Sequence, residues 1–340
     1  MVREIVRQGI EQQLYSGAVY SVWQNGIEKN TGALGVAERE TNEKMTVEHL
    51  FDFASVTKLF TTTLILYHIS NKRLKLEDTL ATFQIGPHEI SDISIRQLLM
   101  HRSGLVAWYP FYEDSMKGLN FEKVLQRLPM LRPHSTHEVV YSDLNFMLLR
   151  TICERVDSRS FEQQMYDLLS ELGDEEASFG PITTTKRIVA TEYGNQIEQK
   201  MCADRGLTYH NWRSQTKAIK GEVNDGNCHY FFNGVSGHAG LFGTKDTLLK
   251  LGQLCLKGGD SLIDAELVDQ VFLNEEGGRT LGFSKERMFS NGIGHTGFTG
   301  TMLYIEPTSN LIIVLLTNRL HVDIPRDISE IRKKLIDSIH

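Results

Sequence analysis

Hydrophobic and polar positions predict β-strands near both ends of the chain. Residues 18–23 form an apolar run, and the Gln-Asn-Gly turn at residues 24–26 favours a tight hairpin into a second strand over residues 27–35. Near the other end, residues 299–305 and 311–317 are apolar runs joined by a turn that contains Pro and Asn. They predict an antiparallel pair, and the second run is apolar enough to be a central strand.

Helical periodicity occupies the middle of the chain and returns at both ends. Residues 5–14 predict a short amphipathic helix that ends near Gly17, and residues 328–339 predict a closing helix. Residues 173–234 lack sustained periodicity, so we expect an extended loop system there. The other expected helices cover residues 93–101, 121–128, 146–156, 161–172 and 246–256.

A strand is also expected near residues 51–53, and a helix follows it. If this helix begins at Ser55, Lys58 lies one turn later on the same face, where its amine can reach the serine hydroxyl. A serine hydroxyl is a weak nucleophile until a neighbouring base takes its proton, so this pair indicates nucleophilic catalysis. The first helical turn also presents unpaired N–H groups and the positive end of the helix dipole, which stabilise negative charge.

The S-x-x-K spacing occurs twice, at Ser55 to Lys58 and at Ser214 to Lys217. Residues 59–67 are apolar on nearly every side, which predicts a buried helix, and a lysine buried there must be paired or neutral. Ser214 lies in a polar stretch and is interpreted as a surface residue. On the spacing alone, a purely structural role for Ser55 stays open.

The composition is that of an ordinary globular protein with one large or two modest domains, since 41% of its 340 residues are hydrophobic and 23% are charged. The net charge of −7 and a pI of about 6.0 argue against nucleic acid or an anionic membrane as the partner. No apolar run reaches the roughly 18 residues of a membrane span, and the first residues lack the apolar core of a signal peptide, so a cytoplasmic location is expected. The sequence contains no metal-ligand or disulfide spacing, so we expect no metal and no cofactor. The four cysteines are expected to be reduced and to pack in the interior: Cys153, Cys202, Cys228 and Cys255.

Two further segments carry residues that could act with Ser55. Tyr141-Ser-Asp143 precedes a helix, and a tyrosine beside a lysine ammonium has its phenolate favoured, which makes it a plausible general base. Tyr141 and Asp143 can both face one cavity only from a turn; the alternative is a packed tyrosine with Asp143 as a helix N-cap. His295-Thr-Gly297 precedes a strand, where the glycine lets a substrate backbone approach; the alternative is a turn histidine with a strand-terminal glycine.

In chain order, S-x-x-K at Ser55, Y-x-N/D at Tyr141 and H/K-T-G at His295 resemble the motifs of the serine β-lactamase and penicillin-binding superfamily. The resemblance is to the class C β-lactamase-like branch, which also contains D-alanyl peptidases and esterases. Further segments that look like family sequence cover residues 98–105, 141–149 and 237–242. The resemblance therefore extends over nearly the whole chain.

The resemblance implies an α+β fold. Its antiparallel sheet would be built from both chain ends and flanked by the N- and C-terminal helices, with an inserted, mainly helical lobe. Residues 1–340 would form a single catalytic unit with the site between the lobes. The discontinuous α/β lobe would cover residues 1–80 and 235–340, and the helical lobe with its loops would cover residues 81–234.

The resemblance also implies roles for single residues. Ser55 would be the acylated nucleophile, Lys58 its proton acceptor, and Tyr141 the general acid/base for the leaving group and the deacylating water. The backbone N–H groups of Ser55 and Phe298 would form the oxyanion hole, where one donor is typically worth about 3 to 4 kcal/mol. The remaining substrate-binding positions would be Asp143, His295, Thr296 and Gly297.

Two residues depart from the family pattern. Asp143 stands where the class C branch commonly has asparagine, and an ionised carboxylate cannot donate a hydrogen bond to a substrate amide. His295 replaces the usual lysine and is largely neutral near pH 7, which weakens recognition of a substrate carboxylate. His101 and His238 lie in family-like segments, and we expect structural roles for both.

These observations favour a metal-independent serine hydrolase that acts through an acyl-enzyme on a small ester, amide or D-amino-acid peptide. Within enzymes, the alternatives are a penicillin-binding D-alanyl carboxypeptidase and a β-lactamase, with a β-lactam as a possible ligand. From another class, the alternative is a catalytically silent binding scaffold that keeps the fold.

Overall fold

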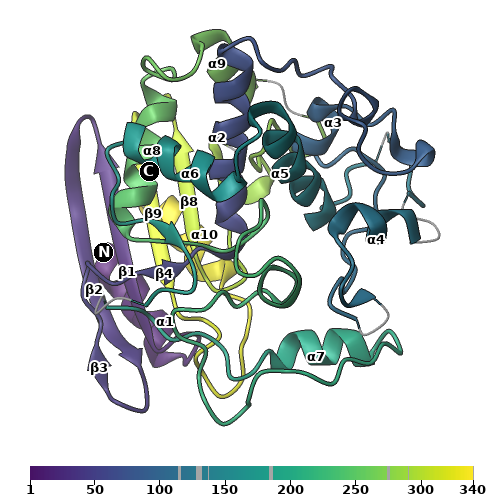
Figure 1. Cartoon of the computed structure of the whole chain (residues 1–340). Helices are drawn as coiled ribbons and strands as arrows, with labels where there is room; N and C mark the ends of the chain where they lie inside the picture. Colours follow the sequence, from purple (N-terminus) through teal and green to yellow (C-terminus); the bar gives the residue numbers. More distant parts are fainter. Residues whose placement is uncertain are drawn as a thin grey trace.

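A six-stranded antiparallel sheet joins the two ends of the chain (Figure 1). The computed structural model that shows it describes residues 1–113, 116–127, 132–136, 138–183, 187–273, 276–289 and 291–339. The strand order is β3-β2-β1-β9-β8-β7. In that order the strands cover Glu43–Lys44, Ile27–Glu38, Gly17–Gln24, Leu311–Thr317, Met302–Glu306 and Ile293–Thr296.

Strand β9 is central, as its apolar sequence predicts. It pairs with β1 on one side, with Ala18 opposite Thr317, and with β8 on the other. Successive side chains of a strand point to opposite faces of the sheet. Accordingly, Leu311, Ile313 and Leu315 pack into one hydrophobic cluster, and the even-numbered residues between them pack into the other.

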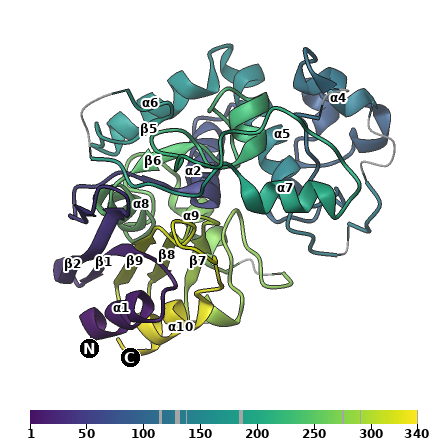
Figure 2. The same cartoon turned by 90° about the horizontal axis from the view of Figure 1, so that it is seen from below.

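Helices cover both faces of this sheet. On one face lie α1 (Val2–Glu11) and α10 (Ser329–Asp337), which Figure 2 shows side by side near the two termini. On the other face, α8 (Lys245–Leu256) contacts β8 and β9. The remaining α-helices are α2 (Thr57–Ser70), α3 (Ile95–Leu99), α4 (Phe121–Arg127), α5 (Asp143–Asp157), α6 (Phe161–Glu171), α7 (Gln196–Ala203) and α9 (Ala265–Leu273).

Most predicted elements are present, with shifted ends. The N-terminal helix ends at Glu11 and not near Gly17, because Gln13 takes a left-handed φ of 56° and the chain turns there. The second strand continues beyond residue 35, to Glu38. The helix expected over residues 121–128 is α4, and residue 128 lies outside the described residues.

The strand expected near residues 51–53 is present as β4 (Phe51–Asp52), which belongs to a separate three-stranded sheet of order β4-β6-β5 and pairs with β6 (Leu241–Gly243). Residues 173–234 are not only loops, since they contain α7 and β5 (Ser178–Phe179). The proposed division of the chain into two lobes stays a prediction.

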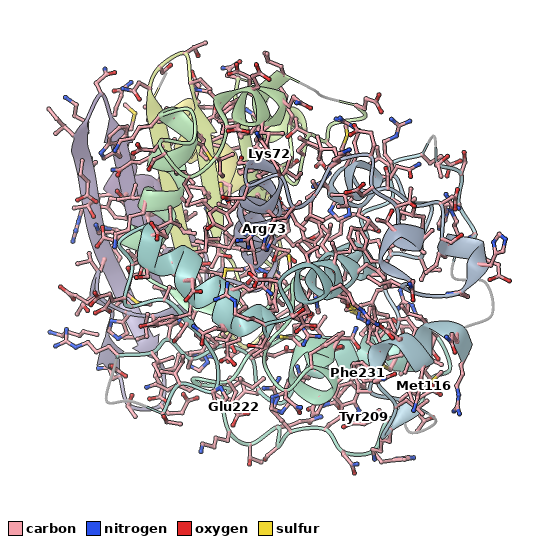
Figure 3. The ribbon with its side chains drawn as sticks, turned by 45° about the horizontal axis from the view of Figure 1, so that its top comes forward. Lys72, Arg73, Met116, Tyr209, Glu222 and Phe231 are labelled. Carbon is pink, nitrogen blue, oxygen red and sulfur yellow. The ribbon has the colours of Figure 1, made fainter. Side chains whose placement is uncertain are left out.

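Helix α2 is buried along most of its length and contacts α5 and α6. It extends away from Ser55, and Lys72 and Arg73 follow its C-terminal end; Figure 3 shows these two residues well apart from Tyr209 and Phe231. The helices of the described residues are too short or too polar to cross a membrane. The N-terminal end of α2 is where the candidate site lies.

Candidate active site

Ser55 lies in a sharp turn between β4 and α2. Residues Ala54–Val56 form a 3₁₀ turn, so the α-helix begins at Thr57 and not at Ser55 as expected. Ala54 has a φ of 46°, a conformation that costs a non-glycine residue roughly 1–3 kcal/mol. The Asp52 carboxylate stabilises it by accepting a hydrogen bond from the Ala54 N–H at 2.9 Å. Such strained backbone concentrates at functional sites, which fits the position of the serine directly after it.

The segment after β7 packs directly against this turn. The Thr301 hydroxyl donates to the Phe53 carbonyl at 2.9 Å, and the Thr299 hydroxyl donates to the Asp52 carbonyl at 2.8 Å. A Cβ atom on Gly297 would clash with Thr301 Oγ1 and with the Phe53 carbonyl. Glycine is therefore required at this position, because two backbone segments approach each other closely there.

Lys58 lies beneath Ser55, as the spacing predicts. Its side chain is 0% exposed, and its Nζ is 3.0 Å from Ser55 Oγ. The same Nζ is 2.8 Å from Asp143 Oδ1 and 3.2 Å from the His238 carbonyl oxygen. An ammonium group has three N–H donors, and each of them has an acceptor here. This geometry is that of a charged lysine.

The electrostatics agree with that geometry. Burial alone would lower the pKa of the Lys58 ammonium, but the charge of Asp143, with a contribution from Tyr141, outweighs burial and raises this pKa above its ordinary value. Lys58 must therefore lose a proton before it can accept one from Ser55. The ion pair with Asp143 is the main structural obstacle to that loss.

Tyr141 and Asp143 both face the cavity at Ser55, as expected for residues in a turn. The Tyr141 ring centroid is 4.9 Å from Lys58 Nζ. The alternative in which Asp143 caps the helix is wrong, because Ser142 takes the N-cap position and Asp143 is the first residue of α5. The turn is fixed by the Ser142 N–H, which donates to His101 Nδ1 at 3.0 Å.

His101 and His238 are hydrogen-bonded to neighbours of Tyr141 and Ser55 and do not line the cavities themselves. His101 is buried and accepts the Ser142 N–H, which fixes the backbone next to Tyr141. His238 has its Nε2 2.9 Å from Asp225 and its Nδ1 2.8 Å from the Ser236 hydroxyl. Its own carbonyl oxygen accepts from Lys58. These contacts agree with the structural roles expected for both residues.

His295 is buried beside Tyr141, with ring centroids 5.9 Å apart. Its Nδ1 is 2.8 Å from the Thr296 carbonyl oxygen, and because a carbonyl can only accept, Nδ1 carries the proton. Burial, followed by the charges of Lys58 and Arg279, lowers the pKa of His295 well below its ordinary value. The imidazole is therefore neutral and presents Nε2 as an acceptor, so the cation that a lysine would supply here is missing.

Two adjoining cavities meet at Ser55, Tyr141 and Phe298. The smaller, of about 190 Å³, also contains Asp143 in its wall, and the larger, of about 320 Å³, also contains His295. Larger hollows of about 680 and 730 Å³ on the described surface are lined by other parts of the chain. The predicted site residues are thus brought together around Ser55, whereas Ser214 is exposed and contacts the Thr216 hydroxyl.

Further residues line the site on both sides of Ser55 and were not predicted from the sequence. Glu192, Glu198 and Asp225 line the smaller cavity, and Arg279 lines the larger one. The Arg279 guanidinium lies 5.2 Å from the Tyr141 ring centroid and is paired with Glu286. These residues come from segments without periodicity or motif, so only the fold reveals their position. Among the described residues, no group of three His, Cys, Asp or Glu side chains is placed to hold a metal ion.

Comparison with known proteins places these observations in a family. The N-acetylmuramyl-L-alanine amidase of Bacillus subtilis (strain 168) is 30% identical over 370 aligned positions, which cover 94% of this chain and 81% of the relative. A putative D-alanyl-D-alanine carboxypeptidase of Escherichia coli (strain K12) is 28% identical, over 82% of this chain and 71% of the relative.

A solved structure supports the fold. The class C β-lactamase from Rhodobacter sphaeroides superposes with a TM-score of 0.73 at 17% identity, over 99% of both chains. The expected α+β architecture, an antiparallel sheet with helices on both faces, is therefore confirmed. A family model described as Beta-lactamase matches residues 2–335, and the chain therefore belongs to the beta-lactamase family, a family of hydrolases.

Proposed function

We propose that this protein is a serine hydrolase that forms an acyl-enzyme on Ser55 and acts on a small amide, ester or D-amino-acid peptide. The observation that carries the proposal is the 3.0 Å contact between Lys58 Nζ and Ser55 Oγ at the wall of a cavity. The relatives support the substrate class, because one is named an amidase and another a carboxypeptidase.

In the proposed reaction, Ser55 Oγ attacks the substrate carbonyl carbon and its proton passes to the neutral amine of Lys58. Tyr141 then donates a proton to the leaving amine or alcohol as the carbonyl–leaving-group bond breaks. A water molecule then attacks the acyl carbon and gives one proton to the Tyr141 phenolate. The Lys58 ammonium returns its proton to Ser55 Oγ as the acyl–Oγ bond breaks, which releases the acid and restores all three groups. Both proton carriers border the nucleophile, since Lys58 Nζ is 3.0 Å from Ser55 Oγ and Tyr141 lines the same cavity as Ser55.

The carbonyl oxygen would be stabilised by the backbone N–H groups of Ser55 and Phe298, with the substrate along Thr296 and Gly297. The close approach of Gly297 to the Phe53 carbonyl and the hydrogen bond from the Thr301 hydroxyl to the same carbonyl support this arrangement, because they hold the two N–H-bearing segments together. Rigid donors aimed at the developing negative charge are the largest single contribution in many acyl-transfer enzymes.

A second candidate function is a penicillin-binding D-alanyl carboxypeptidase, and Arg279 favours it. This guanidinium lines the larger cavity and could receive a substrate carboxylate in place of the missing lysine charge. Because Asp143 is engaged as the partner of Lys58, we expect a β-lactam to acylate Ser55 without efficient turnover. Gel detection of a fluorescent penicillin on the protein, with nitrocefin hydrolysis measured in parallel, separates trapping of the β-lactam from its turnover.

A cytoplasmic location of the protein stays a prediction.

The test compares the two serines of the two S-x-x-K segments. Ser55→Ala should abolish hydrolysis of a p-nitrophenyl ester, while Ser214→Ala should leave it unchanged, with the same circular dichroism for both variants. Turnover retained by Ser55→Ala would reject the proposal. If the unmodified protein neither hydrolyses the ester nor reacts with a fluorophosphonate or β-lactam probe, the silent-scaffold alternative takes its place.

A further inference from the structure

The smaller cavity beside Ser55 is lined by acidic side chains. Asp143, Glu192, Glu198 and Asp225 all contribute to its wall. Glu198 comes from α7, which Figure 1 shows below α4 and α5 and apart from the six-stranded sheet. An active-site cavity whose wall carries one sign of charge concentrates ligands of the opposite sign.

The two aspartates already have partners that are cationic or can become so. Asp143 Oδ1 is 2.8 Å from Lys58 Nζ. Asp225 Oδ1 is 2.9 Å from His238 Nε2, and His238 is the first of the neighbours that lower the pKa of Asp225. These contacts explain both aspartates without any ligand.

The two glutamates are held by neutral donors. Glu198 accepts a hydrogen bond from the Tyr112 hydroxyl at 2.7 Å and another from the Gly226 N–H at 2.8 Å. Glu192 accepts from the Ile197 N–H at 2.7 Å. Neutral donors orient a carboxylate but do not form an ion pair with it, so its charge stays costly in a buried position.

The pKa values of the two glutamates are raised, because burial outweighs the effect of their neutral hydrogen-bond donors. Burial raises the pKa of Glu198, and the neighbouring charge of Asp225 raises it further. Burial also raises the pKa of Glu192, and the surrounding N–H donors and Arg213 do not fully offset it. A cation in the cavity would stabilise both ionised carboxylates.

The cavity combines this charge with apolar walls and a small size. Trp108 and Met201 line it together with the acidic residues. Its volume of about 190 Å³ lies below the roughly 300 Å³ at which pockets for drug-sized ligands begin. It therefore suits one small group with both an apolar and a cationic part.

His295 gives independent evidence that a ligand occupies the adjoining larger cavity, which meets the smaller one at Ser55. Its Nε2 is buried and has no hydrogen-bond partner within the described part of the chain. The ring lines the larger cavity, which shares Ser55, Tyr141 and Phe298 with the smaller one. Because Nδ1 carries the proton, Nε2 is an acceptor that an N–H or O–H group of a ligand would satisfy.

We propose that the acyl part of the substrate carries a protonated amine, which Glu198 binds while Glu192 and Asp225 add to the attractive field. The substrate class is then an aminoacyl amide, ester or short peptide with a free amino group and a small or apolar side chain. This inference rests on the proposed acyl-enzyme at Ser55 and narrows its substrate. The amine occupies the smaller cavity, and the leaving group occupies the larger one.

The test uses matched substrates that differ only at the amine. D-alanine p-nitroanilide and N-acetyl-D-alanine p-nitroanilide, with the L-forms alongside, are compared by kcat/KM on the full chain. A hydrogen bond between charged groups in such a cavity is worth about tenfold or more in binding. We therefore expect the free-amine substrate to be preferred by at least about tenfold.

Glu198→Gln separates the charge from the shape, because glutamine keeps an oxygen for the Gly226 N–H and a polar group beside Tyr112. It should lower kcat/KM for the free-amine substrate by about tenfold and leave the acetylated substrate unaffected. Glu113→Gln is the matched control, since Glu113 also accepts from a tyrosine hydroxyl, that of Tyr109 at 3.0 Å. This control should leave both substrates unchanged.

A measurement without any variant covers the case in which Glu198→Gln does not fold. D-alaninamide should protect Ser55 from a fluorophosphonate probe at a concentration at least about tenfold lower than N-acetyl-D-alaninamide does. Equal protection by both compounds, or equal or faster hydrolysis of the acetylated substrate, would overturn the inference. Failure of the probe to label Ser55 at all would instead refute the proposed function on which it rests.

Discussion

Removal of the negative charge at Asp143 should make Lys58 a better base. In Asp143→Asn, the side-chain oxygen still accepts from Lys58 Nζ, so the hydrogen bond now measured at 2.8 Å is kept and the charge is lost. The family pattern commonly has asparagine at this position. The substitution therefore tests whether the ion pair, and not the hydrogen bond, keeps Lys58 protonated.

The magnitude follows from the distance. At 2.8 Å and an effective dielectric constant of about 20, the Coulomb attraction is about 6 kcal/mol. Measured pKa shifts from one opposite charge are smaller, about 1–3 units, because lost hydration offsets part of the attraction. At 1.36 kcal/mol per unit, we expect the pKa of Lys58 to fall by about 1–3 units, or about 1.4–4 kcal/mol.

The assay is the pH dependence of kcat/KM, which reports ionisations of the free enzyme. The neutral amine is the active form, and the pKa of Lys58 is raised above 10.5 in the unsubstituted protein, so its activity should rise with pH throughout the accessible range. The Asp143→Asn profile should level off about 1–3 units lower.

The control is Asp204→Asn, which removes the charge of an aspartate that also contacts a lysine, Lys200, at 3.0 Å, but on the exposed surface. It should leave the pH profile unchanged. A profile of Asp143→Asn that superposes on that of the unsubstituted protein, or is displaced to higher pH, would show that Lys58 is not the titrating proton acceptor.

Three further variants test other parts of the site. Tyr141→Phe should lower kcat about 100-fold or more, because it removes a general acid/base, and a loss below about tenfold in steady-state assays would exclude that role. Gly297→Ala should destabilise the protein by about 1–3 kcal/mol in urea unfolding, because the new Cβ clashes with Thr301 Oγ1 and the Phe53 carbonyl; an unchanged midpoint would contradict this packing. Burial and the charge of Asp225 raise the pKa of Glu198 in the folded protein above its pKa in the unfolded chain. Between these two pKa values the folded state binds a proton that the unfolded state does not, so the free energy of unfolding falls as pH rises. Glu198→Gln should therefore flatten the decline in melting temperature between about pH 5 and pH 8, and an equally steep decline would refute the assignment.

The parts of the site that depend on local spacing could be predicted from the sequence. Ser55 and Lys58 are three residues apart, so a single turn brings them together whatever the rest of the fold does. The apolar residues after Lys58 likewise predict a buried α2, and burial explains why this lysine needs a partner. Strands β1 and β9 were predictable because their apolar runs and turns are local signals as well.

The contacts that determine the charge of the site are not local. Asp143 reaches Lys58 across 85 residues of sequence, and β4 finds its partner β6 nearly two hundred residues later along the chain. Spacing and periodicity carry no information about such pairs. The acidic cavity has the same origin, because Glu192, Glu198 and Asp225 belong to a region whose short α7 buries only Cys202 and shows no clear apolar stripe.

The most direct test of the central claim is the mass of the protein during turnover. The protein is mixed with a p-nitrophenyl ester, quenched in acid within the first turnover, digested and analysed by mass spectrometry. We predict one acyl group per chain, on the peptide that contains Ser55, and no adduct in Ser55→Ala. An adduct on another residue, or release of p-nitrophenol with the Ser55 peptide unmodified throughout, would contradict the account.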